Sequence, residues 1–213
     1  MKKKFNLKQK GFTIIELMIT IFIFATMTTY LLAKYGTFNQ SILLTNLAYD
    51  VALTIRTAQS YGLNVKSVAT NPADSLSFSY PYGVHFDVSS AHNKSFIFFA
   101  DQDLVTADQF GDGTYDSGDD DEEFPLDEKI SAYTIKRGSY ISGICVKNEE
   151  DEECTAADKL DVSFRRPDPD AIIIGEAEGS RSEWRYAEVN LSATDGSTKK
   201  IIVRSTGQIA ITN

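Results

Sequence analysis

The sequence predicts an α+β protein, in which one long N-terminal helix packs on a mainly antiparallel β-sheet head. An apolar run from Phe12 to Ala33 contains a single charged residue, Glu16, and apolar residues at helical spacing continue from there to Gly62. From residue 76 onward, apolar residues alternate with polar ones, as in half-buried strands. The change of period places the helix first and the strands after it.

The apolar run is long enough to cross a membrane. At a rise of about 1.5 Å per residue, a helix over Phe12–Ala33 spans a hydrocarbon core of about 30 Å. Five lysines and no acid precede this run, which predicts that they stay in the cytoplasm and that everything after Lys34 lies outside. A carboxylate costs roughly 2.5 to 3.5 kcal/mol at the centre of a span and less near its end, so Glu16 needs a partner or a purpose.

The start of the run resembles the processing site of type IV pilins and type II secretion pseudopilins. A basic leader ends at Gly11, Phe12 would begin the mature chain, and Glu16 would be its fifth residue. The resemblance implies cleavage after Gly11 by a prepilin peptidase/methyltransferase and N-methylation of Phe12. It further implies storage in membrane lipid, followed by assembly with other pilin or pseudopilin subunits at an inner-membrane platform, into an extracytoplasmic or surface filament.

The resemblance divides the chain into four segments. These are a cleaved leader at 1–11, a transmembrane and fibre-core helix at 12–33, an amphipathic helix at 34–62 and an extracytoplasmic β-rich head at 63–213. In the filament, the Glu16 carboxylate would neutralise the new amino terminus of a neighbouring subunit at Phe12. The alternative is an acid near the end of an ordinary signal anchor, reaching to the interface. Many pilins carry a proline near the middle of the helix; here Gly36 stands in that region instead.

The spacing of apolar residues predicts the second half of the helix and the strands that come after it. A one-sided stripe predicts that the helix continues to about Tyr61, and Asn-Pro in the segment 63–75 predicts a loop. Asp195-Gly196 and Gly207 predict turns between the last strands, and Tyr80–Gly83 a turn or an edge between the first two. The stripe comprises Leu44, Leu47, Ala48, Val51, Ala52, Ile55, Ala58 and Gly62. The predicted strands lie at 76–80, 84–88, 96–100, 130–135, 140–146, 160–164, 171–174, 186–191, 201–203 and 209–211.

Composition narrows the function classes. The formal charge is −9, and loss of the five leader lysines takes it to −14, which disfavours unspecific binding of nucleic acid through the whole surface. Cys145 and Cys154 flank an acidic segment, and in an exported domain such a pair predicts a disulfide; two free thiols in a reducing setting are the alternative. No nucleophile motif, phosphate loop or metalloprotease motif is present, so we expect no enzyme.

Residues 101–123 are rich in acids and predict a calcium site. Calcium takes six to eight oxygen ligands, and acids near a glycine bend supply them. Counting from Asp108 gives a partial EF-hand-like pattern, but Phe110 stands where a ligand is expected and Asp119 replaces the usual Glu. An inserted turn joining the first two acids to Asp112 and Asp116, or a solvated acidic loop without metal, are the alternatives. The candidate ligands are Asp101, Asp103, Asp108, Asp112, Asp116 and Asp119.

Two functions remain in view. The first is a structural subunit, a minor pilin or pseudopilin, because Tyr82–Phe86 and Phe98–Asp101 resemble the H type of these proteins. The second is a binding module on the same fibre for DNA or another surface ligand. Basic residues gather near the C-terminal end, and the candidate nucleic-acid contacts are Lys199, Lys200 and Arg204.

Overall fold

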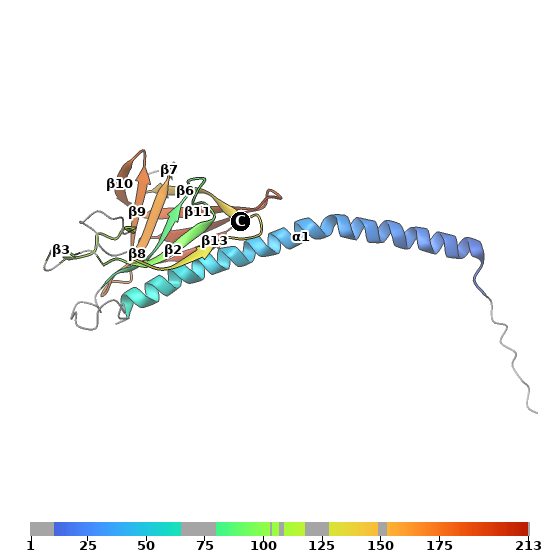
Figure 1. The fold of residues 1–213 in the computed structure, drawn as a ribbon, viewed down its shortest axis with the longest axis horizontal. Helices are drawn as coiled ribbons and strands as arrows, with labels where there is room; N and C mark the ends of the chain where they lie inside the picture. Colours follow the sequence, from blue (N-terminus) through green and yellow to red (C-terminus); the bar gives the residue numbers. More distant parts are fainter. Residues whose placement is uncertain are drawn as a thin grey trace, which may run out of the picture. The chain divides into compact units, whose positions relative to one another are not determined.

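A computed structural model describes residues 11–64, 80–102, 104–106, 109–117, 128–148 and 153–212. The predicted α+β fold is confirmed: in these residues, helix α1 (Ile14–Leu63) is followed by strands and by no second helix (Figure 1). The chain divides into two compact units, Met1–Asn39 and Gln40–Asn213. The first unit therefore holds the N-terminal part of α1, and the second, here called the head, holds the rest of α1 and the strands.

The head contains two larger sheets in place of the single sheet expected, and every strand pair in them is antiparallel. The six-stranded sheet has the order β10-β9-β8-β1-β2-β5 and the five-stranded sheet the order β13-β12-β11-β6-β7. The six-stranded sheet comprises β1 (Tyr82–Asp87), β2 (Ser95–Ala100), β5 (Lys129–Thr134), β8 (Lys159–Phe164), β9 (Ala171–Ala177) and β10 (Ser180–Trp184). The five-stranded sheet comprises β6 (Tyr140–Lys147), β7 (Thr155–Ala157), β11 (Tyr186–Ser192), β12 (Thr198–Arg204) and β13 (Ile209–Thr212). A short pair, β3 (Leu104–Thr106) and β4 (Gln109–Phe110), stands apart.

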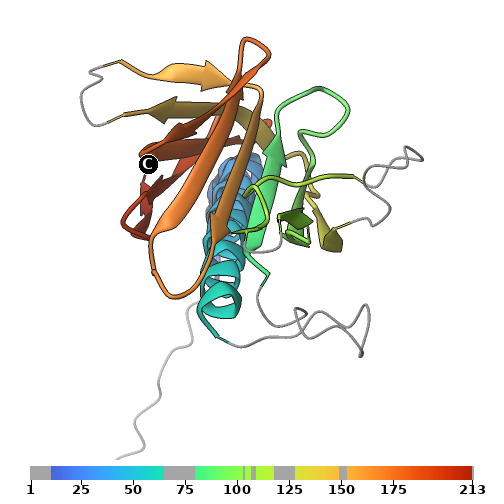
Figure 2. The ribbon, with the colours of Figure 1, turned by 90° about the vertical axis from the view of Figure 1, so that its left-hand side faces the viewer.

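The head portion of α1 packs against both sheets along one side of the head, between the edge strands β5 and β13. Figure 2 shows this part of the helix end-on, with green and orange strands of the six-stranded sheet and red strands of the five-stranded sheet around it. The apolar stripe predicted from the sequence is the buried face: Leu44, Ala48, Val51 and Ile55 are at most 1% exposed. These side chains join one core with residues of both sheets, whereas Tyr49 and Leu53 on the opposite face of the helix are exposed, so the helix closes one side of the head.

Two contacts fix the end of the helix against the head. Gly62 lies against β8 so closely that a Cβ there would clash with the carbonyl of Phe164. Gln59 donates from Nε2 to the carbonyls of Pro169 (3.3 Å) and Gly207 (3.2 Å), which lie in two separate connections. The last turns of α1 are therefore positioned by backbone atoms as well as by apolar packing.

Most predicted strands in the described residues are present, and the differences lie at the start of β1, in β7 and β10, and in the short pair β3–β4, which was not predicted. Tyr80–Gly83 was expected to be a turn, but β1 already begins at Tyr82, where pairing with both β2 and β8 extends the strand. Strands β7 and β10 were not predicted, because their residues do not alternate between apolar and polar. The turns at Asp195-Gly196 and Gly207 are confirmed as the connections β11–β12 and β12–β13. The strand expected at 76–80 lies outside the described residues except for Tyr80.

Candidate processing and binding sites

The first turn of α1 contains a capping arrangement that the sequence analysis missed. The amide N–H of Glu16 donates to Thr13 Oγ1 at 3.3 Å, and the amide of Leu17 donates to the Thr13 carbonyl at 3.1 Å. Thr13 is thus the N-cap, and Thr-x-x-Glu is the spacing of a capping box. A carboxylate in the first turn also interacts favourably with the helix dipole. Glu16 therefore stabilises its own helix start, independently of any neighbouring chain.

The apolar part of α1 is exposed to its surroundings throughout. Among the described residues, α1 is the one helix long and apolar enough to cross a membrane, and none of its most apolar window is buried. Its four threonine hydroxyls donate back to carbonyls of the same helix at 2.8 to 2.9 Å. A hydroxyl satisfied in this way needs no water, which suits a hydrocarbon environment. These four residues are Thr20, Thr26, Thr28 and Thr29.

Two buried carboxylates hold the described part of the acidic segment. Asp101 is fully buried, and its Oδ2 accepts the amide N–H of Gly113 at 2.7 Å. Glu128, 2% exposed, accepts the amides of Gln102 at 2.6 Å and Asp116 at 3.0 Å on its two oxygens. The sequence analysis did not single out Glu128, which lies beyond the acidic run. These carboxylates order the backbone of the segment by accepting hydrogen bonds from it.

Only three of the six predicted calcium ligands, Asp101, Asp112 and Asp116, lie in the described residues. Asp112 accepts both the amide and the hydroxyl of Thr114 on Oδ1, at 2.8 and 2.6 Å. No group of three His, Cys, Asp or Glu side chains in the described part of the chain is placed to hold a metal ion. Asp103, Asp108 and Asp119 lie outside the described residues. Calcium binding stays a prediction.

A polar cleft of about 510 Å³ lies on the outer side of the six-stranded sheet. On its floor, His85 Nδ1 and Asp161 Oδ1 are 2.7 Å apart, and the ring of Tyr115 lies 5.1 Å from that of His85. Burial raises the pKa of the Asp161 carboxyl, and the neighbouring His85 and Arg181 oppose that shift. Arg181 also donates to Thr114 Oγ1 at 3.2 Å. His85 is thus paired with a buried acid.

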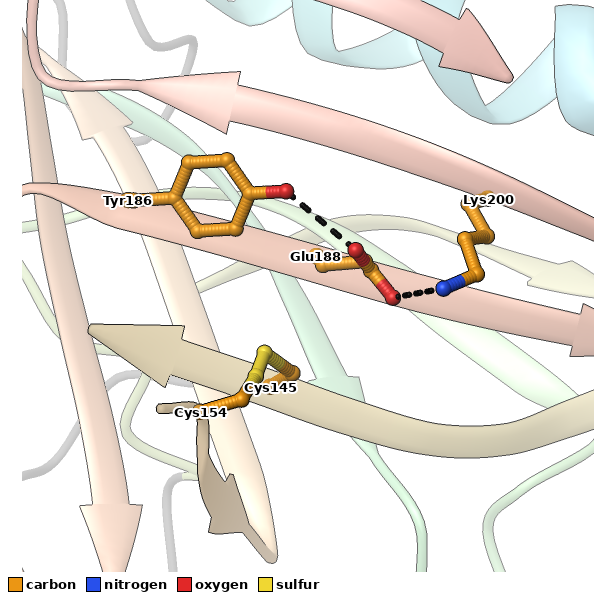
Figure 3. The surroundings of a disulfide bond; sticks show 5 residues. All are labelled: Cys145, Cys154, Tyr186, Glu188 and Lys200. Atoms are coloured by element: carbon orange, nitrogen blue, oxygen red, sulfur yellow. Dashed lines mark hydrogen bonds and ion pairs between the residues drawn. A yellow bond between two sulfur atoms is a disulfide. The ribbon is translucent and has the colours of Figure 1, made fainter. Parts of the chain in front are cut away.

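The candidate nucleic-acid contacts lie on β12 but differ in their surroundings. Lys200 Nζ is 2.8 Å from Glu188 Oε1, and Glu188 also accepts the Tyr186 hydroxyl at 3.2 Å (Figure 3). The guanidinium of Arg204 instead lies 5.7 Å from the centre of the Tyr186 ring, and Lys147 Nζ lies 5.1 Å from it. Lys199 is a half-buried residue of the same strand. The charge of Lys200 is therefore neutralised locally, whereas Arg204 lines a pocket of about 200 Å³ with Lys147 and Arg185.

The predicted disulfide is confirmed. Cys145 on β6 and Cys154 just before β7 are bonded, with their Cα atoms 5.6 Å apart (Figure 3). The bond joins the two strands at the point where Cys145 pairs with Ala156. It closes the acidic connection between β6 and β7.

Comparison with known families returns one match at the N-terminus. Residues 6–32 match the prokaryotic N-terminal methylation motif. The matched segment includes Gly11, Phe12, the Thr13 cap and Glu16, together with most of the exposed apolar part of α1. No curated protein and no solved structure matches the chain.

Proposed function

The chain is a type IV pilin-like protein, and we propose that it is a structural subunit, a minor pilin or pseudopilin, of a type IV pilus or type II secretion filament. The observation that carries the proposal is the methylation motif at the start of a helix whose apolar side chains are left exposed. Exposed apolar surface of this extent needs lipid or protein to cover it, and a filament subunit meets first one and then the other.

The proposed pathway starts with cleavage after Gly11. The five leader lysines hold the cleavage site on the cytoplasmic side, and the head lies outside the membrane. Removal of the leader leaves Phe12 as the amino terminus, one residue before the Thr13 cap. Methylation at Phe12 keeps the charge of this amine. The prepilin peptidase/methyltransferase, the membrane assembly platform and other pilin subunits are the partners.

Thr13 and Glu16 then have tasks that can be separated. The Thr13 hydroxyl caps the helix by accepting the backbone amide of Glu16, whereas in the filament the charge of Glu16 would pair with the amino terminus of a neighbour. Gln also fits the third position of a capping box, so Glu16→Gln retains size and capping but loses the charge. Thr13→Ala does the reverse, because it removes the capping hydroxyl and retains the carboxylate.

The test is carried out in the native host with the full chain. We expect the wild-type mature protein to start at methylated Phe12 by mass spectrometry, and to appear in sheared or sedimented filaments. Glu16→Gln should insert in the membrane but lose incorporation, whereas Thr13→Ala should largely retain it. An intact leader in the wild type, or normal incorporation of Glu16→Gln, would contradict the proposal.

A second function, binding of DNA or another anionic ligand by the filament, is favoured by one observation. In the described residues, none of the three cations of the small pocket, Lys147, Arg185 and Arg204, forms an ion pair with a carboxylate. Phosphate contacts need little more than such a group of cations. Purified full-length protein in detergent should then be retained on DNA at low salt and released by higher salt, and Arg204→Ala should weaken retention. No retention at low salt would remove this function.

A further inference from the structure

The large apolar side chains that remain exposed on the described part of the head gather on α1 and on one edge strand. Tyr49 and Leu53 are 62% and 64% exposed on α1, and Ile42 lies two turns earlier on the same helix. On β5, Ile130 and Tyr133 are 46% and 44% exposed. The other large apolar side chains of the described head are buried or half-buried.

These side chains border two grooves, one on each side of α1. Strands β13 and β5 are the edges of their sheets, and the head portion of α1 has one of them on each flank. The β13 groove, about 380 Å³, is lined by Tyr49, Ala52, Leu53, Arg56, Ile209 and Ile211. The β5 groove, about 350 Å³, is lined by Leu47, Asp50, Leu53, Phe96 and Tyr133, with three threonines. Leu53 is the ridge between them.

The two grooves are alike in apolar character and opposite in charge. Arg56 is the one charged residue of the β13 groove, and Asp50 the one charged residue of the β5 groove. Neither side chain forms an ion pair with another described residue. In the β5 groove, Tyr133 stacks on Phe96 with ring centres 5.0 Å apart, which gives a firm aromatic wall. Each groove therefore offers apolar contact area and one unpaired charge.

We propose that the β13 groove of one head docks on the β5 groove of a second copy of this chain. Two like grooves facing each other would oppose Arg56 to Arg56 or Asp50 to Asp50, whereas unlike grooves place Arg56 against Asp50. Where one such contact joins two heads, one groove of each kind stays free at the ends, so the contact repeats along an open helix. Free strand edges are also where chains associate most readily. The inference rests on the proposed filament function and names the surfaces through which heads join.

The test uses charge reversal in the full-length protein in detergent, followed by sedimentation velocity. Arg56→Glu makes both grooves acidic, and Asp50→Lys makes both basic, so each variant should raise the dissociation constant of self-association at least about tenfold. Mixing the two variants should restore association, because each acidic groove then meets a basic one. Lys94→Glu and Glu183→Lys change the net charge by the same amounts at exposed positions outside the grooves, and should associate as the wild type does.

Restoration by mixing also shows that each variant is folded, since an unfolded chain would not regain a partner. Association of either variant at the wild-type level, a mixture that stays dissociated, or a wild type that does not self-associate would overturn the proposal. The experiments also distinguish a failure of the groove proposal from a failure of the filament function. If Arg56→Glu enters filaments normally while Glu16→Gln does not, the grooves are not the contact but the filament function stands. A wild type that keeps its leader removes the filament function instead.

Discussion

Gly62 lies at the closest approach of α1 to the six-stranded sheet, where any side chain would meet the Phe164 carbonyl. We expect Gly62→Ala to destabilise the head, because the clash is with backbone and not with a side chain that can turn aside. Strain of this kind costs about 1 to 3 kcal/mol. The measurement is the free energy of unfolding of the full-length protein in detergent, followed by the near-ultraviolet signal of the head.

Gly36→Ala is the matched control for this substitution. Gly36 lies in the same helix and has nothing within 4 Å of an added Cβ. Both substitutions gain helix propensity, worth up to about 1 kcal/mol, but only the one at Gly62 meets an obstacle. Equal effects of the two substitutions would show that the helix does not pack against β8 as closely as described.

Tyr82 links the core to the pH dependence of stability. Burial, with a smaller contribution from Tyr61, raises the pKa of Tyr82 from 10.0 to about 12. Between these two values the unfolded chain has lost the phenolic proton and the folded chain has kept it, so unfolding releases a proton and a rise in pH favours it. Stability should therefore fall from about pH 10 to about pH 12. Tyr82→Phe should flatten this slope in urea unfolding curves, and an unchanged slope would contradict the burial of the hydroxyl.

At the scale of elements, the described residues of the acidic segment, among them Gln102, Gly113 and Asp116, are ordered by protein groups. Asp101 and Glu128 fix its two ends through backbone amides, and Asp112 is engaged with Thr114. A calcium ion would have to compete for these oxygens or use acids outside the described residues. The predicted site requires that millimolar calcium raise the melting temperature of the full-length protein relative to a chelator. Equal midpoints would contradict it, and Asp101→Asn is the variant that should abolish any shift.

The sequence predicted those elements whose contacts are encoded locally. The stripe from Leu44 to Ala58 has the helical period because one face of α1 is buried, and strands such as β11 alternate because one face of the sheet is buried. Strand β10, Ser180–Trp184, is exposed along most of its length and carries no such alternation, so it was missed. The disulfide was predictable from two cysteines in one short segment.

Sites built from distant segments were not predictable in this way. His85 and Asp161 meet because β1 pairs directly with β8, although strands β2 to β7 lie between these two strands in the sequence. The two grooves depend on α1 lying between β5 and β13, which come from opposite edges of two sheets. No local sequence pattern indicates which strands form the edges of the two sheets. The processing motif was predictable because its chemistry lies within one short stretch of chain.

At the scale of the whole molecule, charge opposes the proposed assembly. After the proposed cleavage the chain would carry a formal charge of −14, so neighbouring heads would repel each other through many charges, while Arg56 and Asp50 would supply a single attraction. Salt reduces the Debye length from about 30 Å at 0.01 M to about 10 Å at 0.1 M. Repulsion between distant exposed charges is thereby screened more than a contact that is closed by apolar side chains.

Self-association should therefore increase with salt over this range, opposite to the behaviour of an interface formed mainly by ion pairs. The measurement is the sedimenting fraction of processed full-length protein in detergent from about 0.01 M to about 0.15 M sodium chloride. Replacing the five acids at 119–123 by their amides should raise association at low salt and reduce its salt dependence, because it removes part of the repulsion. A sedimenting fraction that falls steadily with salt would show that charge pairs, and not the apolar grooves, hold the heads together.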